Sequence, residues 1–393
     1  MKIGDFCKTN AATYSPKENW AEINYLDTGN ITENHIAEIQ HLVVGKGEIP
    51  SRARRKVQKE DIVYSTVRPN QLHYGIITEP VPNMLVSTGF VVVTVDRKIA
   101  DPYYMYFFLT QKDIVEQLQA IGAQSTSAYP SIKPADIENI DIVLPPLNEQ
   151  KAIGRLLWAL EEKAATNQKL NDNLEQQLAI LFNHTFAEDI AVASTETCPM
   201  LGDLITIIDN RGKTPPLTTE IYDYPIIDVG ALKGAGRIVD FNNCTKYVEK
   251  STYETWFRSG HPKPWDILIS TVGSLAEMKI YLGSKGCMAQ NVVAFRATSI
   301  SPLYLYQYLR FIRADLVAYN IGSVQPSIKV THIVKHPVFV PESPKLANFE
   351  EAAKAVTNQL YANYTENEAL KELRDTLLTK LMSGELDVST LDI

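Results

Sequence analysis

The feature that most constrains this chain is a long stretch without proline, residues 147–186. Its apolar residues recur at alternating spacings of four and three, which is the pattern of a coiled-coil seam. Forty helical residues span roughly 60 Å, too long for an ordinary globular helix, so the stretch predicts a long helix that pairs with another. The predicted seam residues are Ile153, Leu157, Leu160, Asn167, Leu174, Leu178 and Leu181. A buried Asn in such a seam lowers stability but fixes the register.

A second stretch, residues 348–383, repeats this pattern and aligns Asn367 with Asn167. Its predicted seam residues are Val356, Leu360, Asn367, Leu370, Leu377 and Leu381. Arg374 is a charged residue at a position of the same predicted seam. Two similar long helices in one chain favour an antiparallel coiled coil.

The segments that precede the two helices are also copies of one another. The run DIVYSTV at 61–67 returns as DILISTV at 266–272, and PSIK at 130–133 returns at 326–329. Matching segments are offset by 196 to 205 residues throughout, which indicates a tandem duplication. The predicted boundaries are residues 1–145 for the first domain, 146–198 for the first helix and its linker, 199–341 for the second domain, and 342–393 for the second helix and tail.

Within each domain the pattern is mixed. Short β-rich runs such as 89–95 predict strands, and one helix is predicted after Pro102 (103–119) and after Pro302 (303–318). A closing strand is predicted at 137–145 and again at 333–341. The fold class is therefore α+β, with two duplicated domains joined by two long helices in a pseudo-twofold arrangement.

Composition limits the compartment and the partners. The four cysteines are scattered without a CxxC pair, which fits a reducing cytosol, and no apolar run approaches the roughly 18 residues of a membrane span. The net charge of −8 is uneven: residues 199–340 carry 15 Lys and Arg against 11 Asp and Glu, whereas 341–393 carry 5 against 10. Local basic patches rather than the net charge therefore decide whether nucleic acid can bind.

Signals for catalysis are weak. Asp101-Pro102-Tyr103-Tyr104 resembles a methyltransferase tetrad, but its copy begins with Ser301, and a Pro in the first turn of a helix explains both. Asp266, Glu277 and Lys279 fit a loose metal-dependent nuclease spacing, for which a structural strand is the stronger explanation. His332 and His336 lie four apart but precede Pro337, so helical metal ligation is not expected. The sequence predicts a binding protein with no catalytic residue, no metal site and no cofactor of its own.

Basic clusters and duplicated polar loops supply the candidates for DNA contact, because their side chains suit phosphates or base edges. A solvated basic loop explains the basic cluster at 51–56 equally well, and also the one at 210–214, when each is considered alone. The candidates are Arg52, Arg54, Arg55, Lys56, Arg68, Gln124, Ser125, Lys133, Arg211, Lys213, Thr214, Ser323, Gln325 and Lys329.

At this point the motifs resemble a family, the specificity subunits of type I restriction-modification systems. The resemblance rests on LPPLNEQK at 144–151, RGKTP at 211–215, DILIST at 266–271, the Gly-Ser-x-Gln loop at 322–325 and LLTKLMSGELDV at 377–388. The start of the second long helix departs from the pattern, since PESPKL at 341–346 lacks the second Pro of the pair and the Glu-Gln pair.

The resemblance implies two target-recognition domains that each read half of a bipartite DNA target, separated by a helical spacer. It implies two methyltransferase subunits that bind S-adenosylmethionine and methylate adenine N6, and a restriction or motor subunit that uses ATP and Mg²⁺. Double-stranded DNA is then the ligand, no membrane is involved, and the location is cytoplasmic. The alternatives are a stand-alone metal-dependent nuclease and a two-domain protein scaffold.

Overall fold

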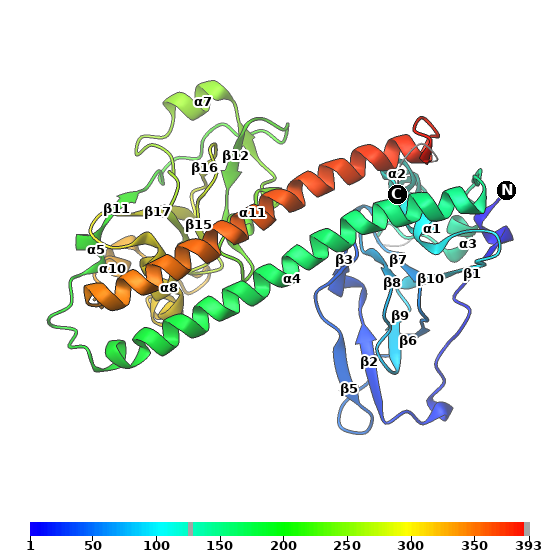
Figure 1. Cartoon of the computed structure of the whole chain (residues 1–393), viewed down its shortest axis with the longest axis horizontal. Helices are drawn as coiled ribbons and strands as arrows, with labels where there is room; N and C mark the ends of the chain where they lie inside the picture. Colours follow the sequence, from blue (N-terminus) through cyan, green and yellow to red (C-terminus); the bar gives the residue numbers. More distant parts are fainter. Residues whose placement is uncertain (125–128, 389–393) are drawn as a thin grey trace. The chain divides into compact units, whose positions relative to one another are not determined.

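The computed structural model describes residues 1–124 and 129–388. Contacts divide the chain into unit 1, Met1–Lys163 with Ala369–Ile393, and unit 2, Ala164–Glu368. Two long helices each contribute to both units, α4 (Leu147–Val192) and α11 (Ser343–Met382) (Figure 1). Among the described residues, every helix is too short or too polar to cross a bilayer.

Unit 1 is built on two four-stranded sheets. The first, in the order β1-β10-β7-β8, is antiparallel throughout. The second, in the order β5-β2-β9-β6, has one parallel pair, β2 with β9. The strands are β1 (Cys7–Thr9), β2 (Glu22–Leu26), β3 (Ile31–Thr32), β4 (His35–Ile36), β5 (Gln40–Val43), β6 (Ala53–Lys56), β7 (Asp61–Ser65), β8 (Tyr74–Ile77), β9 (Met84–Ser87) and β10 (Phe90–Val95). The helices are α1 (Pro102–Leu109), α2 (Lys112–Ala123) and α3 (Pro134–Glu138), with 3-10 turns at Ile3–Asp5, Pro16–Glu18, Thr28–Asn30 and Pro69–Gln71.

Unit 2 repeats this topology with smaller elements. Its antiparallel sheet has the order β11-β17-β14-β15, and β12 pairs in parallel with β16 and antiparallel with β13. The strands are β11 (Ile205–Ile208), β12 (Tyr224–Ile227), β13 (Tyr247–Val248), β14 (Ile267–Ser270), β15 (Met278–Ile280), β16 (Cys287–Met288) and β17 (Val292–Ala297). The helices are α5 (Leu201–Leu204), α6 (Val229–Leu232), α7 (Lys250–Thr255), α8 (Pro302–Phe311), α9 (Arg313–Ala318) and α10 (Val330–Ile333), with a 3-10 turn at Phe241–Asn243.

Close approach of α4 to α1 explains the one glycine in the first long helix. Asp101 caps α1, accepting a hydrogen bond from the Tyr104 amide at 3.0 Å. A Cβ on Gly154 would lie 2.7 Å from the Asp101 carboxylate, so a larger residue would push the two helices apart. In unit 2, Ser301 caps α8 in the same way.

In unit 2 the two long helices run antiparallel. Asn167 donates to the side-chain oxygen of Asn367 at 2.9 Å, and Asn363 donates to Asn171 at 2.7 Å. Nearer the other end, Lys345 pairs with Asp189. The matched asparagines therefore lie side by side and bond to one another, as a register-fixing polar pair would.

The seam departs from the predicted spacing at Leu181. That side chain is exposed, whereas Phe182 is fully buried and packs against Phe186 and Phe349. From 175 to 186 the buried positions are spaced three or four residues apart. Their mean spacing is close to the 3.6 residues per turn of a straight helix, rather than the 3.5-residue repeat of a supercoiled helix. Of the other predicted positions, the buried ones are Ile153, Leu157, Asn167, Leu178, Leu360 and Leu381, and the half-buried ones are Leu160, Leu174, Val356, Asn367, Leu370 and Leu377.

Two predicted features differ from the structure. Each predicted helix of 103–119 and 303–318 is a pair of shorter helices, and the first break lies where the Thr110 hydroxyl bonds to the carbonyl of Tyr106. The predicted closing strands are absent: 137–138 and residue 333 end the short helices α3 and α10, and the rest of 137–145 and 333–341 is irregular apart from single bridges to Lys2 and Met200. Pro134 suits the first turn of α3, which explains a helix there.

A buried ion network fastens the β-rich part of unit 2 to both long helices. The Arg237 side chain is fully buried, and its Nε and Nη2 donate to Glu175 of α4 at 2.9 and 2.8 Å. Its Nη1 donates to Thr357 of α11 at 3.1 Å. Arg310 adds a contact to the same Glu175 at 3.3 Å.

Unit 1 uses a different pair for the same purpose. Arg374 of α11 reaches Glu161 of α4 at 3.2 Å, and the Tyr106 hydroxyl donates to the same carboxylate at 3.4 Å. Burial is the largest influence on this carboxyl and raises its pKa to about 7, although Arg374 opposes the change.

Candidate nucleic-acid interface

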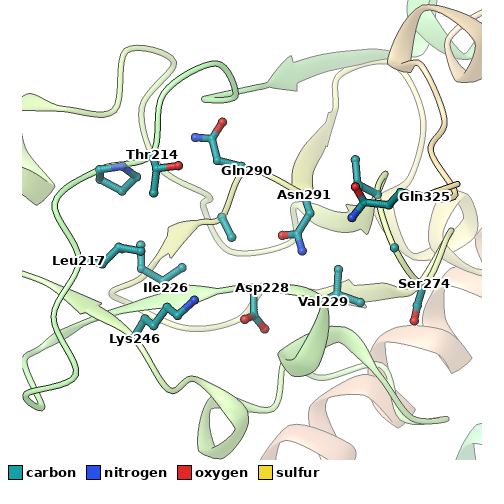
Figure 2. A pocket seen from close by; sticks show the side chains of 14 residues that line it. Thr214, Leu217, Ile226, Asp228, Val229, Lys246, Ser274, Gln290, Asn291 and Gln325 are labelled. Atoms are coloured by element: carbon teal, nitrogen blue, oxygen red, sulfur yellow. The ribbon is translucent and has the colours of Figure 1, made fainter. Parts of the chain in front are cut away.

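A cavity of about 570 Å³ in unit 2 gathers polar side chains from six separate segments (Figure 2). Its size falls within the range of ordinary ligand sites. The segments are the loop after β11, the start of α6, the residue before β13, the turn after β14, the loop before β17 and the Gly-Ser-x-Gln loop, which supplies Gln325. The site thus unites two sequence-predicted residues, Thr214 and Gln325, with others that the sequence did not single out.

Backbone hydrogen bonds hold the cavity walls together. The amide of Thr271, at the end of β14, donates to the carbonyl of Asn291 at 2.8 Å. The Thr271 carbonyl accepts from Ile328, also at 2.8 Å, and Gly273 donates to the Pro326 carbonyl at 3.0 Å. Gly273 has a φ of +87°, a conformation that glycine adopts without strain. The turn and the Gly-Ser-x-Gln loop are therefore locked side by side.

Two carboxamides in this cavity differ in how they are used. The Gln290 side chain accepts from the Gly212 amide at 2.7 Å and donates to the Lys213 carbonyl, so it holds residues 210–214, the basic turn, in place. Asn291, next in sequence, has its side-chain oxygen buried with no hydrogen-bond partner. A buried acceptor without a donor is costly, so Asn291 is suited to a ligand that supplies one.

The remaining polar groups carry opposite charges. Asp228 caps α6 with one carboxylate oxygen, which accepts from the Gly230 amide at 2.8 Å. The exposed Lys246 lines the same cavity, and Ser274 adds a hydroxyl (Figure 2). A cavity with one carboxylate and one ammonium does not favour a phosphate, which prefers several cations.

The basic turn beside the cavity offers fewer free donors than its sequence indicates. Arg211 forms a two-pronged pair with Asp209, at 2.9 and 2.6 Å, and this pairing lowers the pKa of that carboxyl. Its guanidinium is therefore already engaged in shaping the turn. Lys213 and Thr214 are exposed, as are Ser323 and Lys329.

In unit 1 the basic residues of β6 are also divided between packing and exposure. Lys56 pairs with Glu18 and lies over the Trp20 ring, 5.1 Å from its centroid. Arg55 is half-buried, which lowers its pKa. Arg52 is exposed, and Arg54 is half-buried with its Nε bonded to the Ser51 carbonyl at 3.3 Å.

The other candidates of unit 1 lie near its counterpart of the polar loop. Arg68 lies over the Tyr129 ring at 4.5 Å. Gln124 and Lys133 are exposed, and Ser125 lies outside the described residues.

Unit 1 contains the same backbone frame with different side chains. The backbone amide of Thr66 donates to the Gly89 carbonyl at 2.7 Å, and the Thr66 carbonyl accepts from the Ile132 amide at 2.9 Å. The backbone amide of Arg68 donates to the Pro130 carbonyl at 2.9 Å, and this residue has a φ of +49°. These bonds match those of Thr271, Ile328 and Gly273 in unit 2. Gly89 therefore stands where unit 2 has Asn291, and Arg68 stands where unit 2 has Gly273.

The candidate nuclease residues are engaged elsewhere. Asp266 pairs with Arg296 at 2.6 Å, and Glu277 pairs with Arg313 at 2.8 Å. The Lys279 ammonium donates to the Gly234 carbonyl at 3.1 Å, and burial lowers its pKa to about 8. Within residues 1–124 and 129–388, no three His, Cys, Asp or Glu residues are grouped so as to hold a metal. This geometry gives the nuclease alternative no support.

Sequence reasoning missed Asn291, Gln290, Ser274, Asp228 and Lys246. The available signal was the alignment itself, since Gln290-Asn291 precedes a buried strand at the place where the first copy has Thr88-Gly89. A polar pair that replaces a small one at a matched position marks a change in side-chain content within a retained frame.

Comparison with known proteins relates the chain to one family. Residues 1–176 match the family model described as the type I restriction modification DNA specificity domain. The specificity subunit of the HindI type I restriction enzyme from Haemophilus influenzae is 20% identical, over 93% of this chain and 95% of that protein. The MjaIX specificity subunit from Methanocaldococcus jannaschii is 22% identical, over 94% of this chain and 85% of that protein.

A solved structure has a similar fold. The crystal structure of a type I restriction-modification system S subunit from M. genitalium covers 97% of this chain and 95% of its own. Its TM-score is 0.54 at 16% sequence identity.

Proposed function

Because residues 1–176 match the type I restriction modification DNA specificity domain, we propose that this chain is the subunit that reads DNA sequence for a type I restriction-modification complex. Residues 1–145 and 199–341 act as two target-recognition domains, and residues 146–198 and 342–393 form the helical spacer with its linker and tail. Each domain reads one half of a bipartite target. The spacer sets the number of unspecified base pairs between the halves.

The observation that carries this proposal is the duplicated frame with exchanged side chains. Thr66 in unit 1 and Thr271 in unit 2 anchor corresponding loops through corresponding backbone hydrogen bonds. Unit 2, however, has Asn291 where unit 1 has Gly89, and Gly273 where unit 1 has Arg68. Base readout depends on donors and acceptors carried by side chains, whereas the frame only positions them. Two copies of one frame with different contents suit a target whose two halves differ.

In this proposal the chain itself is not a catalyst. Two methyltransferase subunits supply S-adenosylmethionine and methylate adenine N6, and restriction or motor subunits supply ATP-driven cleavage, all in the cytoplasm. The related proteins are named as subunits of restriction enzymes, which supports such partners. The acidic helical segments suit protein docking better than contact with DNA phosphates.

A competition experiment tests the proposal. The purified complex with its methyltransferase subunits should methylate a defined subset of sequences in a random DNA pool, and binding should weaken steeply with salt. Methylation without sequence preference would refute it. The steep fall of DNA affinity with salt would count against the protein-scaffold alternative.

A further inference from the structure

We propose that the unit 2 cavity reads an adenine of the bound DNA through the side chains of Asn291 and Gln325. This inference rests on the proposed function and adds which base is recognised and by which groups. The two carboxamides come from segments far apart in the sequence and both line the cavity (Figure 2). The locked loops place them there in advance of any ligand.

The chemistry of the cavity favours a base over a phosphate. Asp228 lies on its wall, and a carboxylate repels phosphate but accepts a hydrogen bond from an exocyclic amine. Among the described residues that line the cavity, Lys246 is the one cation. Its positive charge offsets the negative charge of Asp228, so the cavity is not a positive site. The nearby Lys213 is better placed for phosphate contact, since it is exposed beside the cavity.

Among the bases, adenine fits the unused groups best. Its major-groove edge presents the N6 amine as donor and N7 as acceptor, and a carboxamide complements both at once. The side-chain oxygen of Asn291 is the acceptor that lacks a donor. Guanine would place its O6 acceptor there and leave both oxygens unpaired, while cytosine would offer a donor without the neighbouring N7.

Unit 1 is the internal comparison. At the position of Asn291 it has Gly89, which has no side chain to read with, and at Gly273 it has Arg68. Arginine pairs with guanine rather than adenine. The adenine preference is therefore a property of unit 2, and a change in its cavity should affect only one half of the target.

The test uses the full chain in complex with its methyltransferase, and compares methylated-site motifs and affinities for duplexes that differ at single base pairs. Asn291→Ala keeps the backbone bond to Thr271 and removes only the carboxamide. It should reduce discrimination for one adenine by roughly 5- to 150-fold and leave the other half of the motif unchanged. Gln325→Ala should act in the same half, whereas Val324→Ala, on the same loop but pointing to solvent, should have no effect.

A change of preference is a sharper result than a loss. Asn291→Asp replaces the carboxamide with an acceptor-only group, so cytosine should become preferred at the affected position. An unchanged motif in Asn291→Ala and Gln325→Ala would overturn the inference, and so would a fall in affinity that is equal for all sequences, as expected of Lys213→Ala. If the unaltered complex has a motif, the proposed function stands whichever result is obtained. If it has none, both fail.

Discussion

Removal of the Glu175 carboxylate should destabilise unit 2 by about 3–5 kcal/mol, because it leaves a fully buried arginine without its counter-charge. Glu175 accepts from the backbone amide, Nε and Nη2 of Arg237, at 2.7, 2.9 and 2.8 Å, and from Arg310 at 3.3 Å. The contacts of Arg237 with Thr357 and Gln307 remain in Glu175→Ala, but both are neutral. The cost is therefore that of an uncompensated charge, not of one lost hydrogen bond.

Urea denaturation followed by hydrogen exchange in unit 2 measures this effect. For an unfolding slope of about 2–3 kcal/mol per molar, the midpoint should fall by about 1–2.5 M. Lys345→Ala removes an exposed partner of Asp189 and should change the midpoint little. Replacing both Glu175 by Leu and Arg237 by Met should recover much of the loss, since apolar residues can replace a buried pair. A midpoint within 0.3 M of the unaltered protein in Glu175→Ala, or a double variant worse than the single, would refute this reasoning.

Three further predictions concern pH, DNA affinity and spacing. Burial raises the folded-state pKa of Glu161 to about 7, so the stability it contributes in acid is lost as pH rises from about 4.5 to about 7. Glu161→Gln should lack this slope in denaturation at pH 5 and pH 8, and parallel curves would contradict the prediction. Lys213→Ala and Arg54→Ala should each weaken binding of all DNA sequences alike and reduce the salt slope by about one, and unchanged affinity at low salt would remove them from the interface. Four residues inserted after Asn167 and four before Asn367 should lengthen the gap between half-sites, and an unchanged gap would show that the helices do not set it.

Regular features of the fold could be predicted from the sequence because they repeat. The long helices follow from the spacing of Ile153, Leu157 and Leu178, and the polar pair from the alignment of Asn167 with Asn367. Spacing failed at Leu181, since the burial of Phe182 depends on Phe349 and Tyr304 in distant segments. The spacing of apolar residues along one helix carries no information about contacts with distant segments.

The site was less accessible to sequence reasoning. Arg211 reads as a free donor, but its neighbour Asp209 occupies it, and only the folded turn brings the two into a two-pronged pair. Asn291 carries no motif, and its unpaired oxygen becomes visible only once the surrounding loops close over it. Base-reading groups are set by tertiary placement, so composition and periodicity locate the frame but not its contents.

The most direct test of this account is to sequence N6-methyladenine in DNA from cells that co-express the chain with its methyltransferase. We expect one motif made of two specified halves that differ in sequence and are separated by a fixed run of unspecified base pairs. Cells that express the methyltransferase alone should lack that motif. A single contiguous motif, or methylation that is the same with and without the chain, would contradict the claim that its two units read the two halves of a DNA target.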